Sequence, residues 1–474
     1  MTIQLDPDLC VIGGGSAGLT VAAAAAAFGV PVVLVERARM GGDCLNHGCV
    51  PSKALIAAAR RAHAMRTPEP FGIAAVEPEI NFAKVMAHVR EVIAGIAPTD
   101  SVERFSGLGV KVVEAEARFV NRHTVVAGDY TIRARRFVIA TGSSPAVPEI
   151  PGLDKAPYLT NETVFDLKKR PEHLLVLGGG PIGMELGQAF RRLGSQVTIV
   201  EAATPLGRED PEMTGPVLEQ FAREGIAVRA GASVVRIGKS RRAIQVVLGT
   251  AAGEEILTGT HLLVATGRTP NIEGLGLEAA GVRHGERGIR VGRRLVTSNG
   301  RIYAIGDVIG GAQFTHAANY HAGLVVRNAL FRLPVRARTE IVPSVTFTDP
   351  EIARVGLDEA AARKAAGRIR ILRWPYHEND RARTERDARG HVKIVADRRG
   401  RVLGAAIVGA DAGELILPFV SMVARRARLT EATGTVVPYP TRGEIGRRAA
   451  IGFFTPGLTN PWVQRIIRFL RKFG

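Results

Sequence analysis

The hydrophobic pattern near the start of the chain predicts a strand, a tight turn, a helix and a second strand. Residues 10–35 form an apolar run long enough to resemble a membrane span. Four glycines interrupt this run near its start, and an alanine-rich stretch lies between two valine-rich pieces. Gly29 follows the alanines, as expected at the end of a helix. The pattern therefore favours a strand–turn–helix–strand unit over a membrane span.

The same pattern returns between residues 174 and 201. An apolar strand at 175–177 leads into a glycine-rich turn, and a helix follows that ends at Gly194. A second strand at 197–200 then reaches an acidic residue, as the first unit does at residue 36. Two copies with the same order of elements indicate an internal duplication.

Both copies carry the glycine spacing of a turn that binds a pyrophosphate. One glycine permits the tight turn, one lets the backbone approach the phosphates, and one lets the helix pack on the strand. The helix N-terminus offers free N–H groups to the phosphates, and an acid after the second strand can bind a ribose 2′-OH. In each copy this acid lies 23 residues after the first glycine. We predict two dinucleotide sites, formed by Gly13, Gly15, Gly18 and Glu36, and by Gly178, Gly180, Gly183 and Glu201.

Three further strand ends support this prediction. Residues 137–142 form a short apolar strand that closes on Thr141 and Gly142, and residues 263–267 form another that closes on Thr-Gly at Gly267. A third strand, at residues 302–307, ends at Asp307. Ligands bind at the carboxyl ends of strands in open parallel sheets. Asp307 is a candidate to hydrogen-bond the ribityl or phosphate region of a flavin, and the alternative is a helix N-cap.

Two closely spaced cysteines are the candidate redox centre. The chain has three cysteines and shows no secretory signal at its start, so we expect a reducing, cytoplasmic environment. Cys44 and Cys49 are expected on one side of a helical start, one turn apart, where a thiolate has a lowered pKa. Such a pair can cycle between dithiol and disulfide. Zinc would need two more soft ligands, and Cys10 is predicted to be buried in the first strand, so no metal site is predicted.

The charge of the chain allows two interpretations. There are 63 Lys and Arg against 45 Asp and Glu, a net charge of +18 that is spread along the whole length. It reflects either a general Arg-rich composition or attraction of anionic partners such as dinucleotides or a membrane surface. Nucleic acid is not expected as a partner, because neither zinc-finger spacing nor an aromatic RNA-binding motif is present.

In this order, the first glycine motif, the Cys-x4-Cys pair, the second glycine motif and the Gly306-Asp307 pair resemble class I flavoprotein disulfide reductases. This is the family of dihydrolipoamide dehydrogenase, glutathione reductase and mercuric reductase. The resemblance covers nearly the whole chain. It implies an α/β fold with two Rossmann-like three-layer domains, for FAD and NAD(P), and a C-terminal α+β dimerisation domain that makes a homodimer. The implied domains are residues 1–150 with 271–339 for FAD, 151–270 for NAD(P) and 340–460 for dimerisation.

The resemblance also implies roles for individual residues. Electrons would pass from a nicotinamide through FAD to Cys44 and Cys49, and then to an acceptor. Cys49 would be the flavin-proximal thiol, Cys44 the interchange thiol, and Lys53 would lie by the flavin N5 and pair with Glu185. The implied contacts are Gly13, Gly15, Gly18, Glu36, Gly42, Lys53, Thr141, Gly142 and Asp307 for FAD, and Gly178, Gly180, Gly183, Glu201 and Gly267 for NAD(P).

The acidic Glu201 favours NADH, because a carboxylate suits a free 2′-OH and repels a 2′-phosphate. NADPH is the alternative, since Arg208 is close in sequence.

The chain departs from its disulfide-reducing relatives near residue 439. Those relatives have a His-Pro followed by a Glu, and the His acts as acid and base across the dimer. Here Glu444 matches, but Tyr439 replaces the His, and tyrosine is a poor base at neutral pH. By similarity to the His-Pro bond, the Tyr439–Pro440 peptide is predicted to be cis.

Three classes of electron acceptor remain open. The first is a small disulfide or thiol-bound acceptor, as in dihydrolipoamide dehydrogenase. The second is a soft metal ion, because mercuric reductases also carry Tyr in this region, although this chain has no cysteine after Cys49. The third is a quinone or protein partner at a membrane. His47 is a candidate to tune the thiolates or to contact a metal, and the alternative is that it has no role.

Residues 461–474 predict a basic amphipathic helix. Six apolar side chains recur at helical spacing, and Arg465, Arg468, Arg471 and Lys472 lie opposite them. Two alternatives remain open: the helix packs on the dimer surface, or it attaches the enzyme to an anionic membrane face or a membrane protein.

Overall fold

The computed structural model describes residues 3–240, 243–250 and 253–473. Met1 and Gly474, the ends of the predicted first domain and last helix, lie outside the described residues. The chain divides into two units. Unit 1 comprises Met1–Pro205 and Ile226–Thr339, and unit 2 comprises Leu206–Gly225 and Glu340–Gly474.

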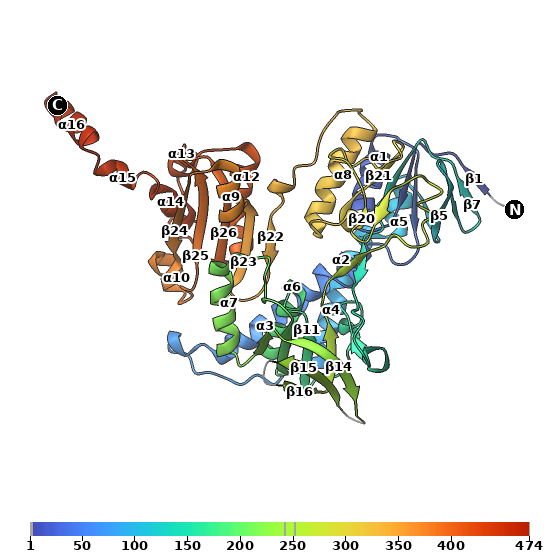
Figure 1. The fold of residues 1–474 in the computed structure, drawn as a ribbon, viewed down its shortest axis with the longest axis horizontal. Coiled ribbons are helices and arrows are strands. Elements are labelled where there is room, and N and C mark those ends of the chain that lie inside the picture. Colours follow the sequence, from blue (N-terminus) through green and yellow to red (C-terminus); the bar gives the residue numbers. More distant parts are fainter. Residues whose placement is uncertain (1–2, 241–242, 251–252, 474) are drawn as a thin grey trace. The chain divides into compact units, whose positions relative to one another are not determined.

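Unit 1 contains two five-stranded parallel sheets with corresponding strand orders. Figure 1 labels β21(Ile302–Ala304) in the first and β11(His173–Leu177) in the second. The first runs β21(Ile302–Ala304)-β8(Arg136–Ile139)-β2(Leu9–Ile12)-β3(Val32–Glu36)-β4(Lys111–Glu114). The second runs β10(Tyr158–Leu159)-β17(His261–Val264)-β11(His173–Leu177)-β12(Gln196–Glu201)-β13(Ala227–Ala230). Helix α1(Ser16–Ala27) joins β2 to β3, and α6(Pro181–Arg192) joins β11 to β12 in the same way. The predicted duplication is therefore confirmed.

The first parallel sheet has packed layers on both faces. Every residue of β2 is buried, as expected for a strand covered on two sides. Leu9 and Val11 face a core with α1 and α8(Thr315–Ala329), whereas Cys10 and Ile12 face the core on the other side. That second core is closed by a sheet of β1(Ile3–Leu5), β7(Tyr130–Ile132), β6(Thr124–Ala127) and β5(Ala117–Asn121). Cys10 is fully buried, and burial raises the pKa of its thiol, so its predicted structural place in the strand is confirmed.

The remaining elements of unit 1 connect and cover these sheets. The helices are α2(Gly42–Asn46), α3(Cys49–Arg66), α4(Phe82–Ile96) and α5(Val102–Gly107), and the 3-10 helices are η1(Glu69–Phe71), η2(Ala97–Asp100), η3(Leu153–Lys155), η4(Val164–Asp166) and η5(Gly306–Ile309). A further 3-10 helix, η6(Thr339–Ile341), includes the last residue of unit 1 and continues into unit 2. β14(Ser233–Lys239), β15(Ile244–Thr250) and β16(Gly253–Gly259) form an antiparallel sheet, β19(His284–Gly285) pairs with β20(Gly288–Ile289), and β9(Ser143–Pro145) pairs with β18(Arg268–Pro270). The β9–β18 pair lies at the two crossovers between the sheets.

Unit 2 is built on a five-stranded antiparallel sheet. Its order is β22(Ser344–Thr346)-β23(Glu351–Gly356)-β26(Val402–Gly409)-β25(His391–Asp397)-β24(Ile369–Pro375). The helical elements are α7(Pro211–Arg223), α9(Glu359–Ala366), η7(Tyr376–Glu378), α10(Asp380–Thr384), α11(Ala412–Leu415), α12(Leu417–Arg425), α13(Leu429–Gly434), α14(Glu444–Ile451), α15(Thr455–Leu458) and α16(Pro461–Leu470). The unit begins its main run at residue 340, where the dimerisation domain was predicted to start.

The segment Leu206–Gly225 belongs to unit 2, although it was predicted within the NAD(P) domain at 151–270. Its helix α7 packs on β23 and β26, with Met213, Val217 and Phe221 fully buried. The motif spacing predicts residues that would bind the nucleotide. It contains no information about which sheet buries the apolar face of α7.

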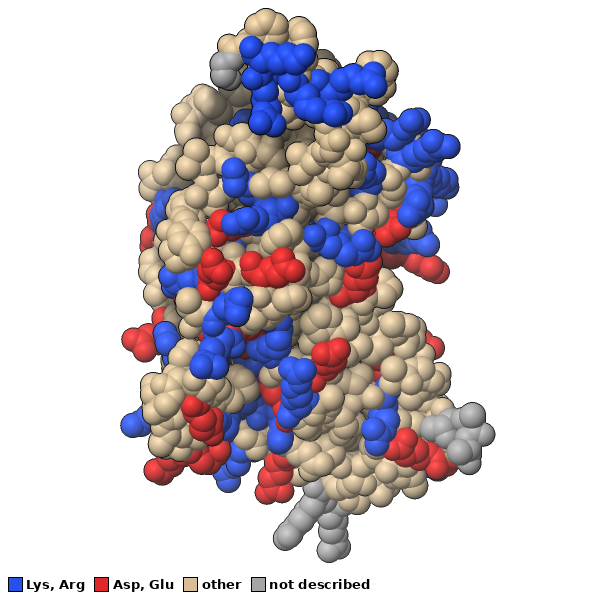
Figure 2. All heavy atoms as spheres, turned by 90° about the vertical axis from the view of Figure 1, so that its left-hand side faces the viewer, with Lys and Arg blue, Asp and Glu red and all other residues tan. Residues whose placement is uncertain are grey.

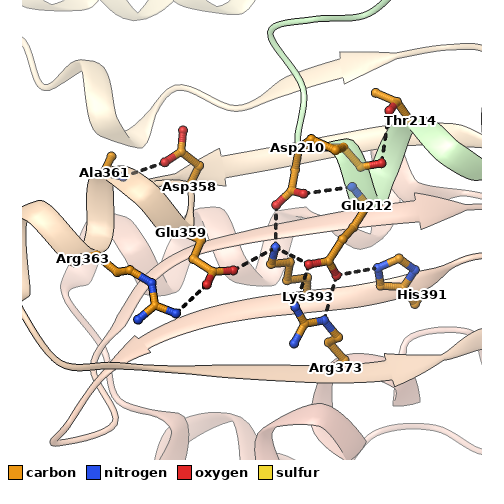
Figure 3. Close-up of polar contacts among 11 residues, drawn as sticks. Asp210, Glu212, Thr214, Asp358, Glu359, Ala361, Arg363, Arg373, His391 and Lys393 are labelled. Carbon is orange, nitrogen blue, oxygen red and sulfur yellow. Dashed lines mark hydrogen bonds and ion pairs between the residues drawn. The ribbon is translucent and has the colours of Figure 1, made fainter.

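An ion-pair network around Lys393 fixes α7 to this sheet (Figure 3). The Lys393 side chain rises from β25 with 4% exposure, and its Nζ lies 2.7 Å from both Asp210 Oδ2 and Glu212 Oε1, and 3.3 Å from Glu359 Oε2. Arg373 pairs with Glu212 at 2.6 Å. Although burial disfavours a charged lysine, the hydrogen bonds to Asp210 and Glu212 raise the pKa of Lys393. The buried charge is therefore paired, as a buried cation requires.

Candidate active site

Both glycine motifs form turns that only glycine fits. Gly13 and Gly178 each have φ of +109°, a region that favours glycine. A Cβ on Gly18 would lie 1.9 Å from the carbonyl oxygen of Gly13, and one on Gly183 would lie 2.0 Å from that of Gly178. Helix and turn therefore approach each other in the same way in both copies, which exposes the backbone N–H groups at the helix N-terminus.

The two predicted ribose-binding carboxylates are held by matching backbone donors. Glu36 accepts hydrogen bonds from the N–H groups of Gly14 and Ala38, the latter at 2.7 Å. Glu201 accepts them from Gly179 at 2.7 Å and Ala203 at 2.8 Å. Each carboxylate oxygen can accept a further hydrogen bond. Both acids are thus fixed at the carboxyl ends of β3 and β12 with acceptor capacity for a ribose hydroxyl.

The first glycine turn lies directly against the start of the redox segment. Gly15 and Gly41 form a parallel backbone bridge, and a Cβ on Gly42 would lie 2.7 Å from the Cα of Gly15. Gly42 begins α2, which carries Cys44. A dinucleotide on this turn would therefore have its pyrophosphate beside the segment that carries the thiols. The donor groups and the missing side chains fit FAD here.

Cys44 and Cys49 lie in two different helices, which corrects the prediction of one shared helical start. Cys44 is in α2, and Cys49 is the first residue of α3. The helical conformation is interrupted between them at His47, which ends α2, and Gly48, which precedes α3. His47 and Gly48 both have non-helical backbone angles, and a Cβ on Gly48 would lie 2.9 Å from Asp43 Oδ2, so a larger residue would not fit there. Both cysteines are thiols in the structure.

The surroundings of the two thiols separate their pKa values. A hydrogen bond from Cys44 lowers the pKa of Cys49 to about 6, and the Thr315 hydroxyl, 3.5 Å from its Sγ, and the charge of Lys53 also lower it. The same Cys44–Cys49 hydrogen bond, together with burial, raises the pKa of Cys44. The position of Cys49 at the N-terminus of α3 also favours the thiolate. Cys49 is therefore the thiolate of the pair near neutral pH.

Lys53 and Glu185 form an ion pair across the two nucleotide-binding halves. Lys53 Nζ donates to Glu185 Oε2 at 2.7 Å, and Glu185 is 5% exposed in α6. Lys53 lies one helical turn after Cys49 on α3. The contact that the family resemblance implied is present, and it places a fixed cation beside the thiolate.

Asp307 belongs to a buried polar cluster. It accepts a hydrogen bond of 2.7 Å from Ser143, and burial raises the pKa of its carboxyl. Arg268 donates to Ser143 Oγ at 2.7 Å and lies 3.2 Å from Asp43 in the redox segment. Asp307 lies in the first turn of η5 and makes no capping bond, so the N-cap alternative is not supported.

The predicted Thr-Gly strand ends hold the crossovers in place. Thr141 Oγ1 donates to the carbonyl oxygen of Asn271 at 2.7 Å, and Thr266 Oγ1 donates to that of Ala146 at 2.9 Å. Gly142 and Gly267 follow with φ of +69° and +148°. These residues position the carboxyl ends of β8 and β17, where ligands bind in parallel sheets.

Tyr439 and Glu444 lie in unit 2. The Tyr439 side chain is 68% exposed, and its hydroxyl donates to Asp380 Oδ2 at 2.9 Å. This hydrogen bond raises the pKa of Tyr439, so the phenol stays protonated. Glu444 begins α14, and the Tyr439–Pro440 peptide is cis, as predicted.

Sequence reasoning missed Thr315, Arg268 and Asp43. Thr315 begins α8 a few residues after the Gly-Asp motif, and Arg268 directly follows Gly267. Their positions next to motifs were the available signal, but only the fold shows that they converge on Cys49 and Asp307. His47 lies at the end of α2, where its carbonyl oxygen accepts from Asn161 at 3.2 Å.

Comparison with known proteins identifies the family. The model of the pyridine nucleotide-disulphide oxidoreductases matches residues 7–322, and the model of their dimerisation domain matches residues 342–450. The chain therefore belongs to the pyridine nucleotide-disulphide oxidoreductase family. It is a flavoprotein oxidoreductase that uses a pyridine nucleotide, and it carries the family's dimerisation domain.

A mercuric reductase and a dihydrolipoyl dehydrogenase are about equally similar to this chain. A mercuric reductase of Streptomyces lividans is 36% identical over 454 residues, which cover 94% of this chain and 96% of the relative. A dihydrolipoyl dehydrogenase of Thermus scotoductus is 37% identical over 461 residues, which cover 92% and 95%. The Cu(II) complex of the HOCl-induced flavoprotein disulfide reductase RclA from Escherichia coli superposes with a TM-score of 0.83 at 29% identity, over 93% of this chain and 98% of the other.

Proposed function

We propose that this enzyme oxidises NADH and delivers the two electrons, through the Cys44–Cys49 pair, to a soft metal ion bound by thiolates. FAD, when bound, supplies the chemistry that couples a nicotinamide to a disulfide. For the pair itself, NADH, one proton and the disulfide give NAD⁺ and the dithiol, and the dithiol with a divalent ion such as Hg(II) then gives the disulfide, two protons and the metal reduced by two electrons. The observation that carries the proposal is the thiolate at Cys49, stabilised by Cys44, Thr315 and Lys53.

Each of these residues has a defined part. Cys49 holds negative charge on Sγ, while Cys44 keeps its proton and is the thiol available for exchange. The buried Glu185 holds Lys53 in place, and the positive charge of Lys53 stabilises the thiolate of Cys49. Arg268 links Asp43, at the start of the redox segment, to the Ser143–Asp307 pair.

NADH is the proposed donor because of Glu201. Its carboxylate is held by two backbone N–H groups and keeps acceptor capacity for a ribose 2′-OH. A 2′-phosphate at the same place would meet a fixed negative charge. The next residues, Ala202 and Ala203, add no cation, and Arg208 belongs to the other unit.

Tyr439 favours the metal ion as acceptor. Reduction of a disulfide needs a group that exchanges a proton with the leaving thiol, and a protonated phenol bonded to Asp380 is a poor base. A metal ion released from thiolates needs no such proton. A small disulfide is the second candidate, supported by the similarity to dihydrolipoyl dehydrogenase and by the lack of any cysteine after Cys49.

An acceptor screen with the FAD-loaded enzyme tests this proposal. NADH oxidation is followed with Hg(II), Cu(II), lipoamide and a soluble quinone, and the Cys49→Ser variant serves as control. We expect the metal ions to give the highest turnover and the variant to lose it. A much higher rate with lipoamide would contradict the argument from Tyr439, and metal-ion turnover retained in Cys49→Ser would contradict the role of the thiol pair.

We also propose a cytoplasmic homodimer. The matched dimerisation domain at residues 342–450 supports the dimer, and the three unpaired cysteine thiols are consistent with a reducing compartment. Light scattering on the purified enzyme should give twice the mass of one chain.

A further inference from the structure

Helix α16 is fully exposed along its whole length. It spans Pro461–Leu470, and none of its residues is buried. Asn460 caps it by accepting a hydrogen bond of 2.9 Å from the Trp462 N–H. In Figure 1, α15 and α16 extend away from the sheet of unit 2. The helix also follows the matched dimerisation domain, which ends at residue 450. The family fold therefore does not account for it.

The side chains of α16 and the three residues after it fall into two separate faces. At about 100° per residue, one face is entirely apolar and the other entirely polar. Large apolar side chains remain in water, with Trp462 70% and Leu470 58% exposed. The apolar face comprises Trp462, Val463, Ile466, Ile467, Phe469, Leu470 and Phe473, and the polar face comprises Gln464, Arg465, Arg468, Arg471 and Lys472.

All charged side chains of the polar face are cations, and Gln464 is its one neutral member. After Glu444 the printed sequence contains no acidic residue, and four of its cations lie between residues 465 and 472. Figure 2 shows Lys and Arg atoms gathered at the top of the view, where this end of unit 2 lies, with no acidic atoms among them. Separated apolar and cationic faces with aromatic side chains are typical of helices that lie in a membrane interface.

We propose that α16 docks this enzyme on an anionic lipid surface. The helix lies parallel to the surface, its apolar face enters the boundary between headgroups and acyl chains, and its Arg and Lys side chains contact lipid phosphates. No helix within residues 3–240, 243–250 and 253–473 is both long and apolar enough to cross a bilayer, so the contact is peripheral.

Charge complementarity favours a lipid surface as the partner of α16. The matched dimerisation domain ends at residue 450, before α16, and an anionic bilayer is complementary to the cationic face of this helix. The apolar face distinguishes lipid from a purely ionic partner, because it gains free energy only where it leaves water. A helix of this length is marginal by itself in water, and a membrane interface would stabilise it.

Vesicle binding of the full-length, FAD-loaded enzyme tests this proposal. The probes are vesicles of equal parts phosphatidylglycerol and phosphatidylcholine, and vesicles of phosphatidylcholine alone. The chain has two tryptophans, so the Trp374→Phe variant reports on Trp462 alone. We expect co-sedimentation with the anionic vesicles only, release at about 1 M salt, where screening acts within about 3 Å, and a blue shift of Trp462 emission.

Substitutions on the two faces separate the contributions. Ile466→Glu should abolish binding, and the matched control Ile256→Glu, at a site with the same 55% exposure in unit 1, should not. The double variant R465Q/R468Q should weaken binding about 25-fold, at about fivefold per cation. Binding retained by Ile466→Glu would overturn the proposal, because the contact would then be ionic only. The proposal would also be overturned by a variant of α16 that still binds the vesicles but is a monomer in light scattering. In that case α16 would pack on a second copy.

Discussion

The thiolate at Cys49 should depend on its hydrogen bond from Cys44. A hydrogen bond to a charged group is worth about 1.5–3 kcal/mol, and one pKa unit corresponds to about 1.36 kcal/mol. Cys44→Ala should therefore raise the pKa of Cys49 by about 1–2 units above its value of about 6. At pH 7 the thiolate fraction would fall from about 0.9 to between about 0.5 and 0.1. Because the folded pKa of Cys49 is lowered, the thiolate is present above that pKa and is lost as pH falls through it.

The assay is a pH titration of the long-wavelength absorption that a thiolate produces beside oxidised flavin. Cys44→Ser is the matched control, because its hydroxyl can still donate to Cys49 at nearly the same place. We expect the midpoint to rise clearly in Cys44→Ala and less in Cys44→Ser. Identical midpoints in the two variants, both near 6, would show that Cys44 does not lower the pKa of Cys49, and the reasoning would be refuted.

Three further outcomes are expected. Lys393→Met removes the cation among three carboxylates and should lower the free energy of unfolding by about 3 kcal/mol, measured as a lower denaturant midpoint. The control Lys364→Met, at an exposed site, should change the free energy of unfolding by less than about 0.5 kcal/mol. The Arg373 hydrogen bond lowers the pKa of Glu212 to about 2, so the stability that this carboxylate contributes is complete above about pH 4.3 and is lost as pH falls toward 2. Glu212→Gln should therefore flatten the dependence of stability on pH in this range. An unchanged pH dependence would contradict the pairing. Glu201→Ala should raise the KM for NADH about 10-fold to 100-fold and reduce the preference over NADPH in steady-state assays, and an unchanged preference would contradict the role of Glu201.

Much of unit 1 could be predicted from the sequence because its motifs are local. The glycine at 13 and the acid at 36 determine a turn and a strand end within one short segment, and the structure confirms both, as it does the second copy ending at Glu201. Lys53 and Glu185 lie far apart in sequence, and only the family resemblance connected them before the fold did.

Other features could not be predicted because they depend on tertiary contacts. The five-residue spacing of Cys44 and Cys49 is compatible with one helix, but the non-helical backbone angles of His47 and Gly48 separate α2 from α3. Thr315 contacts Cys49 although the two residues are 266 positions apart in the sequence, and no local pattern identifies this contact. The hydrophobic pattern of Leu206–Gly225 predicts an ordinary helix, and it does not show that the sheet of unit 2, formed by residues after 340, buries the apolar face of that helix.

The place of Leu206–Gly225 in unit 2 matters for the design of fragments of this protein. A fragment cut at residues 151 and 270, where the motifs place the nucleotide-binding half, would carry α7 away from the strands that cover it. Met213, Val217 and Phe221 would then face solvent, and Asp210 and Glu212 would lose the ammonium group of Lys393. Chimeras that exchange this half between relatives therefore need compatible partners on β23, β25 and β26, and splicing by motif alone would produce an aggregating protein.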